Sequence, residues 1–125
     1  MLDLNEFIPV DLGNGPCSIT LTLNSIIFSR GLLERLKRPD YIKVCISQNE
    51  KMLIVAPADS TDPYAVDMTR MPLRGRINNR EFVKRLKTLT GYKEDDTIKI
   101  VGQYIAEQNL ILFKLIDVAL VVSEL

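Results

Sequence analysis

The sequence predicts a mainly β fold with two short helices, in which one strand–helix–β-hairpin unit occurs twice. Several short segments, such as residues 18–23, alternate polar and apolar side chains with the period of a half-buried β-strand. Two other segments place apolar side chains at helical spacing behind a residue that can cap a helix. A shift of fifty residues brings the elements of the second half onto those of the first, in the same order.

Length and composition exclude several classes of protein. A chain of 125 residues is the size of one domain and can bury roughly two-thirds of its unfolded surface. Apolar residues make up 46% and charged residues 26%, which is ordinary for a soluble globular domain. Sixteen basic and sixteen acidic side chains cancel, so no overall charge attracts the chain to nucleic acid or membrane. The chain has no histidine, which excludes an imidazole base and a histidine metal ligand.

The cysteines and the first residues indicate a reducing compartment. Cys17 and Cys45 lie in apolar, strand-like stretches without Cys-x-x-Cys spacing, so we expect two reduced, buried thiols. Residues 1–10 carry two acidic and no basic side chains, unlike a signal peptide. The apolar run at 118–122 is too short to span a bilayer. We therefore expect a cytoplasmic location and no membrane partner.

The first unit begins with the strand over residues 18–23 and continues as extended chain over 26–28. Ser29 is typical of a helix N-cap, because its hydroxyl can accept hydrogen bonds from the first-turn amides. Pro39 is expected to end this helix, since the residue before a proline avoids helical geometry. A hairpin should follow, with strands over 41–47 and 52–56.

The second unit follows a stretch typical of a linker, residues 57–63, which contains two prolines and two aspartates. Extended chain over 73–77 leads to a helix capped by Asn79 and closed by Gly91. A strand over 97–105 and a partner over 110–116 complete the second hairpin. The apolar stripes of the two helices are Leu32, Leu33 and Leu36 in the first, and Phe82, Val83, Leu86 and Leu89 in the second.

The repeat is most evident in the helices, where the shift places Arg30 on Arg80 and residues 35–37 on residues 85–87. One such unit of about forty residues cannot bury its own apolar face, whereas two can bury each other's. We therefore expect a single domain over 1–125, with repeats at about 18–57 and 68–117 joined by the Pro- and Asp-containing linker. The alternative is an ordinary small β-rich domain without a repeat.

Three short motifs of the second unit carry a family resemblance. Gly-Arg-Ile stands at 75–77, Lys-Arg-Leu at 84–86, and a Thr-Gly turn opens the alternating strand of 90–100. This pattern resembles the AbrB-like (SpoVT/AbrB) swapped-hairpin domain, although Asp95 and Asp96 replace the family's Gly-Asp turn and its usual proline is missing. The resemblance implies an intertwined β-barrel formed by two strand–helix–β-hairpin repeats. It also implies DNA binding, as in transcription regulators or antitoxins.

The charge distribution points to the same function independently. Residues 30–43 and 70–87 hold twelve basic and three acidic side chains, and the rest of the chain carries the opposite balance. A clustered basic face is typical of phosphate binding, and arginine suits both phosphates and guanine edges. A two-fold barrel would bring these residues to one end. The hypothetical DNA-binding residues are Arg30, Arg35, Lys37, Arg74, Arg76, Arg80, Lys84 and Arg85.

The favoured function is therefore a non-catalytic DNA-binding protein of the regulator or antitoxin type, with double-stranded DNA as its partner. The alternative is a protein–protein interaction, assembly or mobile-element protein of the same fold that binds no nucleic acid. Its partner would be another protein or a second copy of the chain, and its arginines would pair with carboxylates. No local pattern proposes catalytic residues, a metal site or a cofactor.

Overall fold

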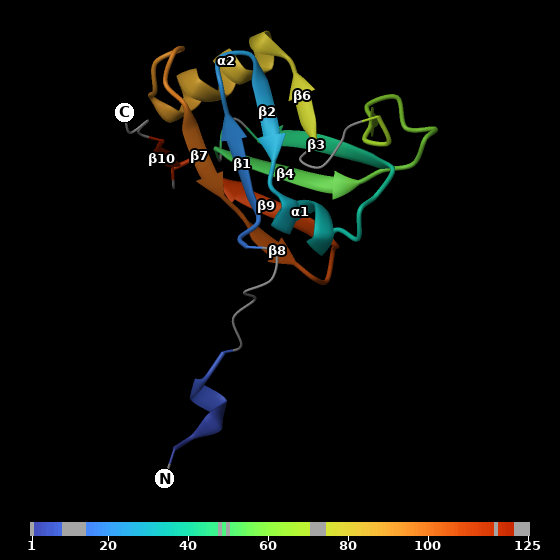
Figure 1. Ribbon diagram of the computed structural model, residues 1–125, viewed down its shortest axis with the longest axis vertical. Coiled ribbons are helices and arrows are strands. Elements are labelled where there is room, and N and C mark those ends of the chain that lie inside the picture. Colours follow the sequence, from blue (N-terminus) through green and yellow to red (C-terminus); the bar gives the residue numbers. More distant parts are fainter. Residues whose placement is uncertain are drawn as a thin grey trace.

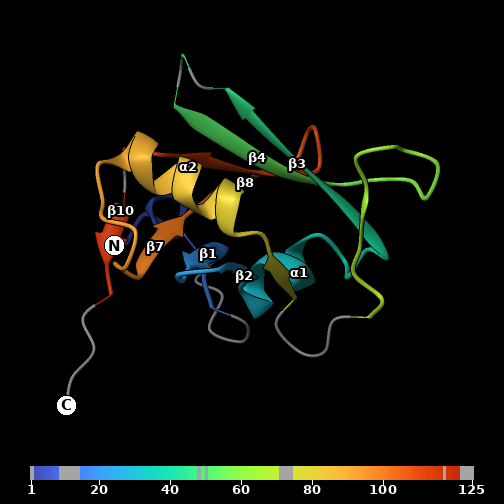
Figure 2. The same cartoon turned by 90° about the horizontal axis from the view of Figure 1, so that it is seen from above.

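The structure is a computed structural model that describes residues 2–8, 15–47, 49, 51–70, 75–116 and 118–121. Within these residues the fold is mainly β with two helices, as the sequence predicts. The strands form two antiparallel sheets of five strands each. The sheets lie one behind the other in Figure 1 and are separated as two layers in Figure 2.

Sheet A contains the strands that precede the two helices, β2 and β6, and has the order β10–β7–β1–β2–β6. Its strands are β1 (Ser18–Leu21), β2 (Ser25–Phe28), β6 (Arg76–Asn78), β7 (Ile98–Val101) and β10 (Val118–Leu120). Sheet B contains the two hairpins, in the order β5–β3–β4–β9–β8. Its strands are β3 (Tyr41–Ser47), β4 (Met52–Pro57), β5 (Val66–Asp67), β8 (Gln103–Ile105) and β9 (Leu110–Lys114).

The helices α1 (Arg30–Arg35) and α2 (Arg80–Thr90) lie at different ends of the two sheets. Figure 1 shows α2 across the upper end and α1 towards the lower end. Both expected N-caps are confirmed, because Ser29 Oγ accepts from the Leu32 amide at 3.1 Å and Asn79 Oδ1 accepts from the Phe82 amide at 3.0 Å. A short 3₁₀ turn, Leu4–Glu6, precedes the sheets.

The two helices end in the same hydrogen-bonding pattern, although they differ in length. Gly91 has φ 81° after α2, as expected, while Lys37 occupies the matching position after α1 with φ 63°. The following amide, of Arg38, donates to the Leu33 carbonyl, as the second closing bond of a Schellman motif requires. The helix therefore ends before Pro39 is reached, which corrects the sequence-based boundary. Helix α2 has 11 residues and α1 only 6.

The core fills the space between the sheets and under the helices. Leu36, Val83 and Leu86 are at most 3% exposed, and Leu33 is also buried, so the predicted helix stripes are confirmed. The other core side chains come from alternate positions of both sheets. They include Ile19, Leu21, Ile26, Phe28, Leu53, Val55, Ile98, Ile100, Ile111 and Phe113.

Each sheet contains strands from both halves of the chain, residues 18–57 and 68–116: β1 and β2 lie between β7 and β6 in sheet A, and β3 and β4 lie next to β9 and β8 in sheet B. In sheet A, β1 pairs with β7 and β2 pairs with β6. In sheet B, β4 pairs with β9, while β3 pairs with β5, which lies between the two halves in the chain. In two of these pairs the strands have similar places in the chain, because β2 and β6 each precede a helix, and β4 and β9 are each the second strand of a hairpin. The second half has the order strand–helix–strand–strand–strand, one strand more than β2–α1–β3–β4 of the first, and each half pairs with the other.

The sheets of the described residues do not close into a barrel. The sequence predicts one strand over 97–105, but this stretch is divided at Gly102 into β7 of sheet A and β8 of sheet B. The Gly102 amide donates to the Cys17 carbonyl at 2.8 Å. A Cβ at this position would lie 2.6 Å from an Ile111 methyl and 2.7 Å from a Phe113 ring carbon. The chain therefore passes between the sheets where only glycine fits.

Substituting Gly102→Ala should lower the free energy of unfolding by about 1–3 kcal/mol, because the added methyl overpacks the core. Urea denaturation followed by circular dichroism measures this. The neighbouring Val101→Ala removes a side chain that is 51% exposed and should change stability by no more than about 0.5 kcal/mol. Equal stabilities of Gly102→Ala and the wild type would contradict the close approach.

Substituting Lys37→Gly should raise the free energy of unfolding by about 0.5–1 kcal/mol, because a side chain with a left-handed backbone is strained there. The matched control is Lys84→Gly in the interior of α2, which should lower stability by about 1 kcal/mol. Both are measured by urea denaturation. Destabilisation by Lys37→Gly would show that α1 does not end at this residue.

Candidate functional surfaces

The solvent-facing side of α2 carries three of the predicted DNA-binding residues. Arg80, Lys84 and Arg85 are exposed and share one side of the helix with Glu81 and Thr88. The opposite side of the helix is buried against the sheets. The amphipathic pattern of the sequence thus leaves a mainly basic strip across one end of the molecule.

Arg76 extends this basic strip onto the outer face of sheet A. It lies opposite Ile27 of β2, which in turn lies opposite Thr20 of β1. Their strand neighbours face the core, so this row faces solvent on the other side of the sheet. Lys99 continues the row on β7. We call the four cations Arg76, Arg80, Lys84 and Arg85 the α2 surface.

Glu94 is an acidic side chain bound directly to the α2 surface. Its Oε1 accepts hydrogen bonds from Arg80 Nη2 at 3.0 Å and Nε at 3.3 Å. The Arg80 hydrogen bond lowers the pKa of Glu94, and the charge of Lys84 lowers it further. Both members of this ion pair are well exposed, so a polyanion can compete with Glu94 for Arg80.

Lys87 is basic in sequence but does not belong to the surface. It is 1% exposed, and its Nζ donates to the carbonyls of Thr22 and Glu94, each at 2.7 Å. Burial lowers its pKa, whereas the nearby carboxylates of Asp96 and Asp95 act in the opposite direction. One ammonium group therefore joins α2 to the turn between β1 and β2 and to the loop that carries Glu94.

The predicted residues of the first half lie elsewhere. Arg30 and Arg35 are the ends of α1, and Figures 1 and 2 place α1 apart from α2. The Arg35 guanidinium lies over the Tyr104 ring, 5.4 Å from its centroid, and Lys37 is exposed just beyond α1. The two helices thus do not bring the basic residues to one end, because they cover different ends of the sheets. Arg74 lies outside the described residues.

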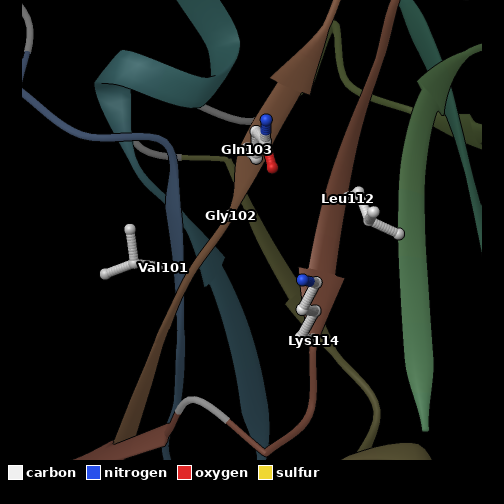
Figure 3. A pocket seen from close by; sticks show the side chains of 5 residues that line it. All are labelled: Val101, Gly102, Gln103, Leu112 and Lys114. Carbon is white, nitrogen blue, oxygen red and sulfur yellow. The ribbon is translucent and has the colours of Figure 1, made fainter.

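The outer face of sheet B is a second candidate surface, and it is apolar. One row across its strands consists of Cys45, Ile54, Leu112 and Gln103, and the next contains Met52. An open hollow of about 240 Å³ is lined by Cys45, Ile46, Ser47, Met52, Ile54 and Leu112. A smaller one of about 140 Å³ lies beside Leu112, between Gly102, Gln103 and Lys114 (Figure 3).

The cysteines agree only partly with expectation. No disulfide joins Cys17 and Cys45. Cys17 is partly buried, but Cys45 is exposed on the outer face of sheet B, so the expectation of two buried thiols is wrong for Cys45. The strand was predicted correctly, but its alternation places Val44 and Ile46 towards the core and Cys45 away from it.

Among the residues that the structure describes, no three side chains of Cys, Asp or Glu form a group that could hold a metal ion. No helix in those ranges is long and apolar enough to cross a membrane.

Comparisons with protein families, with curated proteins and with solved structures gave no match to this chain. Function is therefore inferred from its own side chains. Sequence reasoning missed the roles of Lys87 and Glu94, which depend on contacts between distant segments. It also missed the apolar outer face of sheet B. The signal was present in the sequence, because Cys45, Ile54 and Leu112 occupy the alternate positions of their strands that point away from the core.

Substituting Lys87→Met should lower the free energy of unfolding by about 1–3 kcal/mol, because the Thr22 and Glu94 carbonyls each lose a charged donor. Urea denaturation measures the loss. The same substitution at Lys84, which is exposed on the same helix, is the control and should stay within about 0.5 kcal/mol of wild type. An equally small effect at Lys87 would mean that its two hydrogen bonds contribute nothing net.

Proposed function

We propose that this protein binds double-stranded DNA without catalysis, through the α2 surface formed by Arg76, Arg80, Lys84 and Arg85. The observation that carries this proposal is that four exposed cations come from two consecutive elements, β6 and α2. Phosphate contacts by such groups supply most of the affinity of non-specific DNA binding. The first-half residues Arg30, Arg35 and Lys37 are left out of this interface, because α1 lies apart from α2.

The carboxylate of Glu94, which forms an ion pair with Arg80, would compete with DNA phosphates for this arginine. A DNA phosphate approaching Arg80 must replace the carboxylate of Glu94, and both groups are exposed enough for the exchange to be easy. Arginine can then contact a phosphate through two parallel hydrogen bonds. Removing the Glu94 charge should therefore favour DNA, which a purely structural role of Arg80 does not predict.

The resemblance to AbrB-like domains supports a regulator or antitoxin role. We propose that the two halves are copies of one strand–helix–hairpin unit, related by an approximate two-fold axis and intertwined through their strands. Two strand pairings support this relation, since β2 pairs with its counterpart β6 and β4 pairs with its counterpart β9, as strands next to a two-fold axis would. The matching caps of α1 and α2 support it as well.

The second candidate function is binding of a protein partner without nucleic acid. It is favoured by the engagement of two predicted residues within the chain, Arg80 with Glu94 and Arg35 with Tyr104. In a protein that binds no nucleic acid, the arginines would be engaged by such contacts with other side chains and not by phosphates. The two candidates differ in their response to duplex DNA at low salt.

Duplex DNA of mixed sequence should bind with an affinity that falls steeply with salt, with a log–log slope of about −0.9 for each phosphate neutralised. Fluorescence anisotropy of a labelled duplex measures this. Arg80→Ala should reduce the magnitude of the slope by about one, and Glu94→Gln should raise the affinity.

Arg30→Ala is the matched control, because Arg30 and Arg80 are the first residues of α1 and α2. It should leave the slope unchanged. An equal loss in Arg30→Ala and Arg80→Ala would overturn the restriction to the α2 surface. The absence of salt-dependent binding by wild type would reject DNA and leave the protein-partner candidate.

A further inference from the structure

The N-terminal segment presents apolar side chains to solvent. Leu2, Leu4, Phe7 and Ile8 are between 60% and 84% exposed, and Asp3 with Glu6 gives the segment a negative charge. Figure 1 shows this segment extending away from the two sheets. Apolar side chains gathered in this way are costly to leave in water and usually mark an interaction site. We call residues 2–8 the arm.

The outer face of sheet B has the complementary composition. Its central row is apolar across β3, β4 and β9, and no helix of the described residues covers it in Figure 2. Lys51 and Lys114 are exposed where β4 begins and β9 ends, beside the hollow at Met52. The Leu115 amide donates to the Lys51 carbonyl, which keeps these two ends together. Apolar surface thus borders a positive edge.

We propose that the arm of one chain binds the outer face of sheet B of a second copy, giving a homodimer in which arms are exchanged. Apolar side chains of the arm, Leu4 and Phe7 among them, would occupy the hollows beside Leu112. Asp3 and Glu6 would lie near Lys51 and Lys114, so that charge as well as hydrophobicity is matched. This inference concerns a surface other than the DNA-binding one and does not depend on it.

A second copy is a better source of the arm than the same chain. The arm precedes Ser18 of β1, which belongs to sheet A. The receiving face is the outer side of sheet B, and stacked sheets are about 10 Å apart. The Cys17 carbonyl accepts from the Gly102 amide next to β8, the edge strand of sheet B, so an arm seated on its own chain would have to fold back around this edge. In the single chain the arm extends away from the sheets, its apolar side chains are exposed, and those of Met52, Ile54 and Leu112 are partly exposed.

Cys45 on the receiving face allows a direct test by disulfide trapping. In the variant Asn5→Cys/Cys17→Ser the arm carries one thiol and the face the other, and mild oxidation should give covalent dimers on non-reducing gels. Adding Cys45→Ser should abolish them. A cysteine placed at Gln108, which is exposed on the β8–β9 turn, is the control and should crosslink several-fold less.

Two results of the trapping experiment would overturn the proposal. A disulfide within one chain would show that the arm folds back onto its own face. Crosslinking no stronger than that of the Gln108→Cys control would show that the arm does not visit the face at all.

Sedimentation velocity provides an independent measurement without added cysteines. The wild-type chain should dimerise with increasing concentration, and either removal of residues 2–8 or Leu112→Glu should raise the dissociation constant by about tenfold or more. Leu23→Glu is the matched control, because Leu23 is an exposed leucine at the β1–β2 turn, and it should leave dimerisation unchanged. A monomeric wild type, or a dimer unaffected by loss of the arm, would overturn the proposal.

The two dimer-breaking variants should also complement each other. A chain without residues 2–8 keeps the receiving face, and Leu112→Glu keeps the arm. Mixed together, they should form a heterodimer with one occupied face, at a concentration at which each variant alone is monomeric. This result would also show that both variants are folded. If both variants keep the circular dichroism spectrum of wild type but do not associate, the arm and the face are not partners.

Discussion

Strand β1 of the first half is hydrogen-bonded to β7 of the second, and β4 is hydrogen-bonded to β9. Because of this exchange neither half has a complete sheet of its own, and the apolar side of each is covered only when both are folded. The core is therefore a single cluster drawn from both halves and both helices. We infer that the chain unfolds as one cooperative unit, since separating the halves would break both sheets at once.

The exchange also determines where the surfaces lie. Since each helix follows a strand of sheet A and covers one end of the two layers, α1 and α2 are separated by the sheets themselves. Lys87 then links the folded core to the basic surface. Its ammonium group binds the Glu94 carbonyl, while the carboxylate of the same residue binds Arg80. The position of the loop after α2 thus sets both the stability of the junction and the charge available to a phosphate.

The sequence was most informative where the chemistry of a few neighbouring residues determines where a helix begins or ends. Ser29, Asn79 and Gly91 fix three of the four helix ends, because each supplies a hydrogen bond or a backbone conformation that few residues supply. The sequence was less informative where the two halves of the chain differ in length. Lys37 and Lys87 are aligned by the fifty-residue shift, yet α1 has already ended at Lys37, whereas α2 continues for a further turn beyond Lys87.

The same difference in length explains why charge could not be assigned to surfaces from the sequence. Lys37 has a left-handed backbone just after α1, and its side chain is exposed to solvent. Lys87 lies in the last turn of the longer helix, where its ammonium group reaches carbonyls of other segments. Gly102 shows a related limit, because the alternation of residues 97–105 is that of one strand. Only the contacts of Ile111 and Phe113 reveal that this strand must change sheets.

The separation of charge and apolar surface between the two sheets has a consequence for function. The α2 surface lies across one end of the molecule and along sheet A, whereas the apolar face with Cys45, Ile54 and Leu112 belongs to the outer side of sheet B. A partner bound at either surface therefore leaves the other accessible. For a protein with no net charge, pairing two copies through sheet B would leave the α2 surfaces of both copies accessible. Two weak phosphate-binding sites held together in this way bind far more tightly than either alone, because the second contact becomes intramolecular.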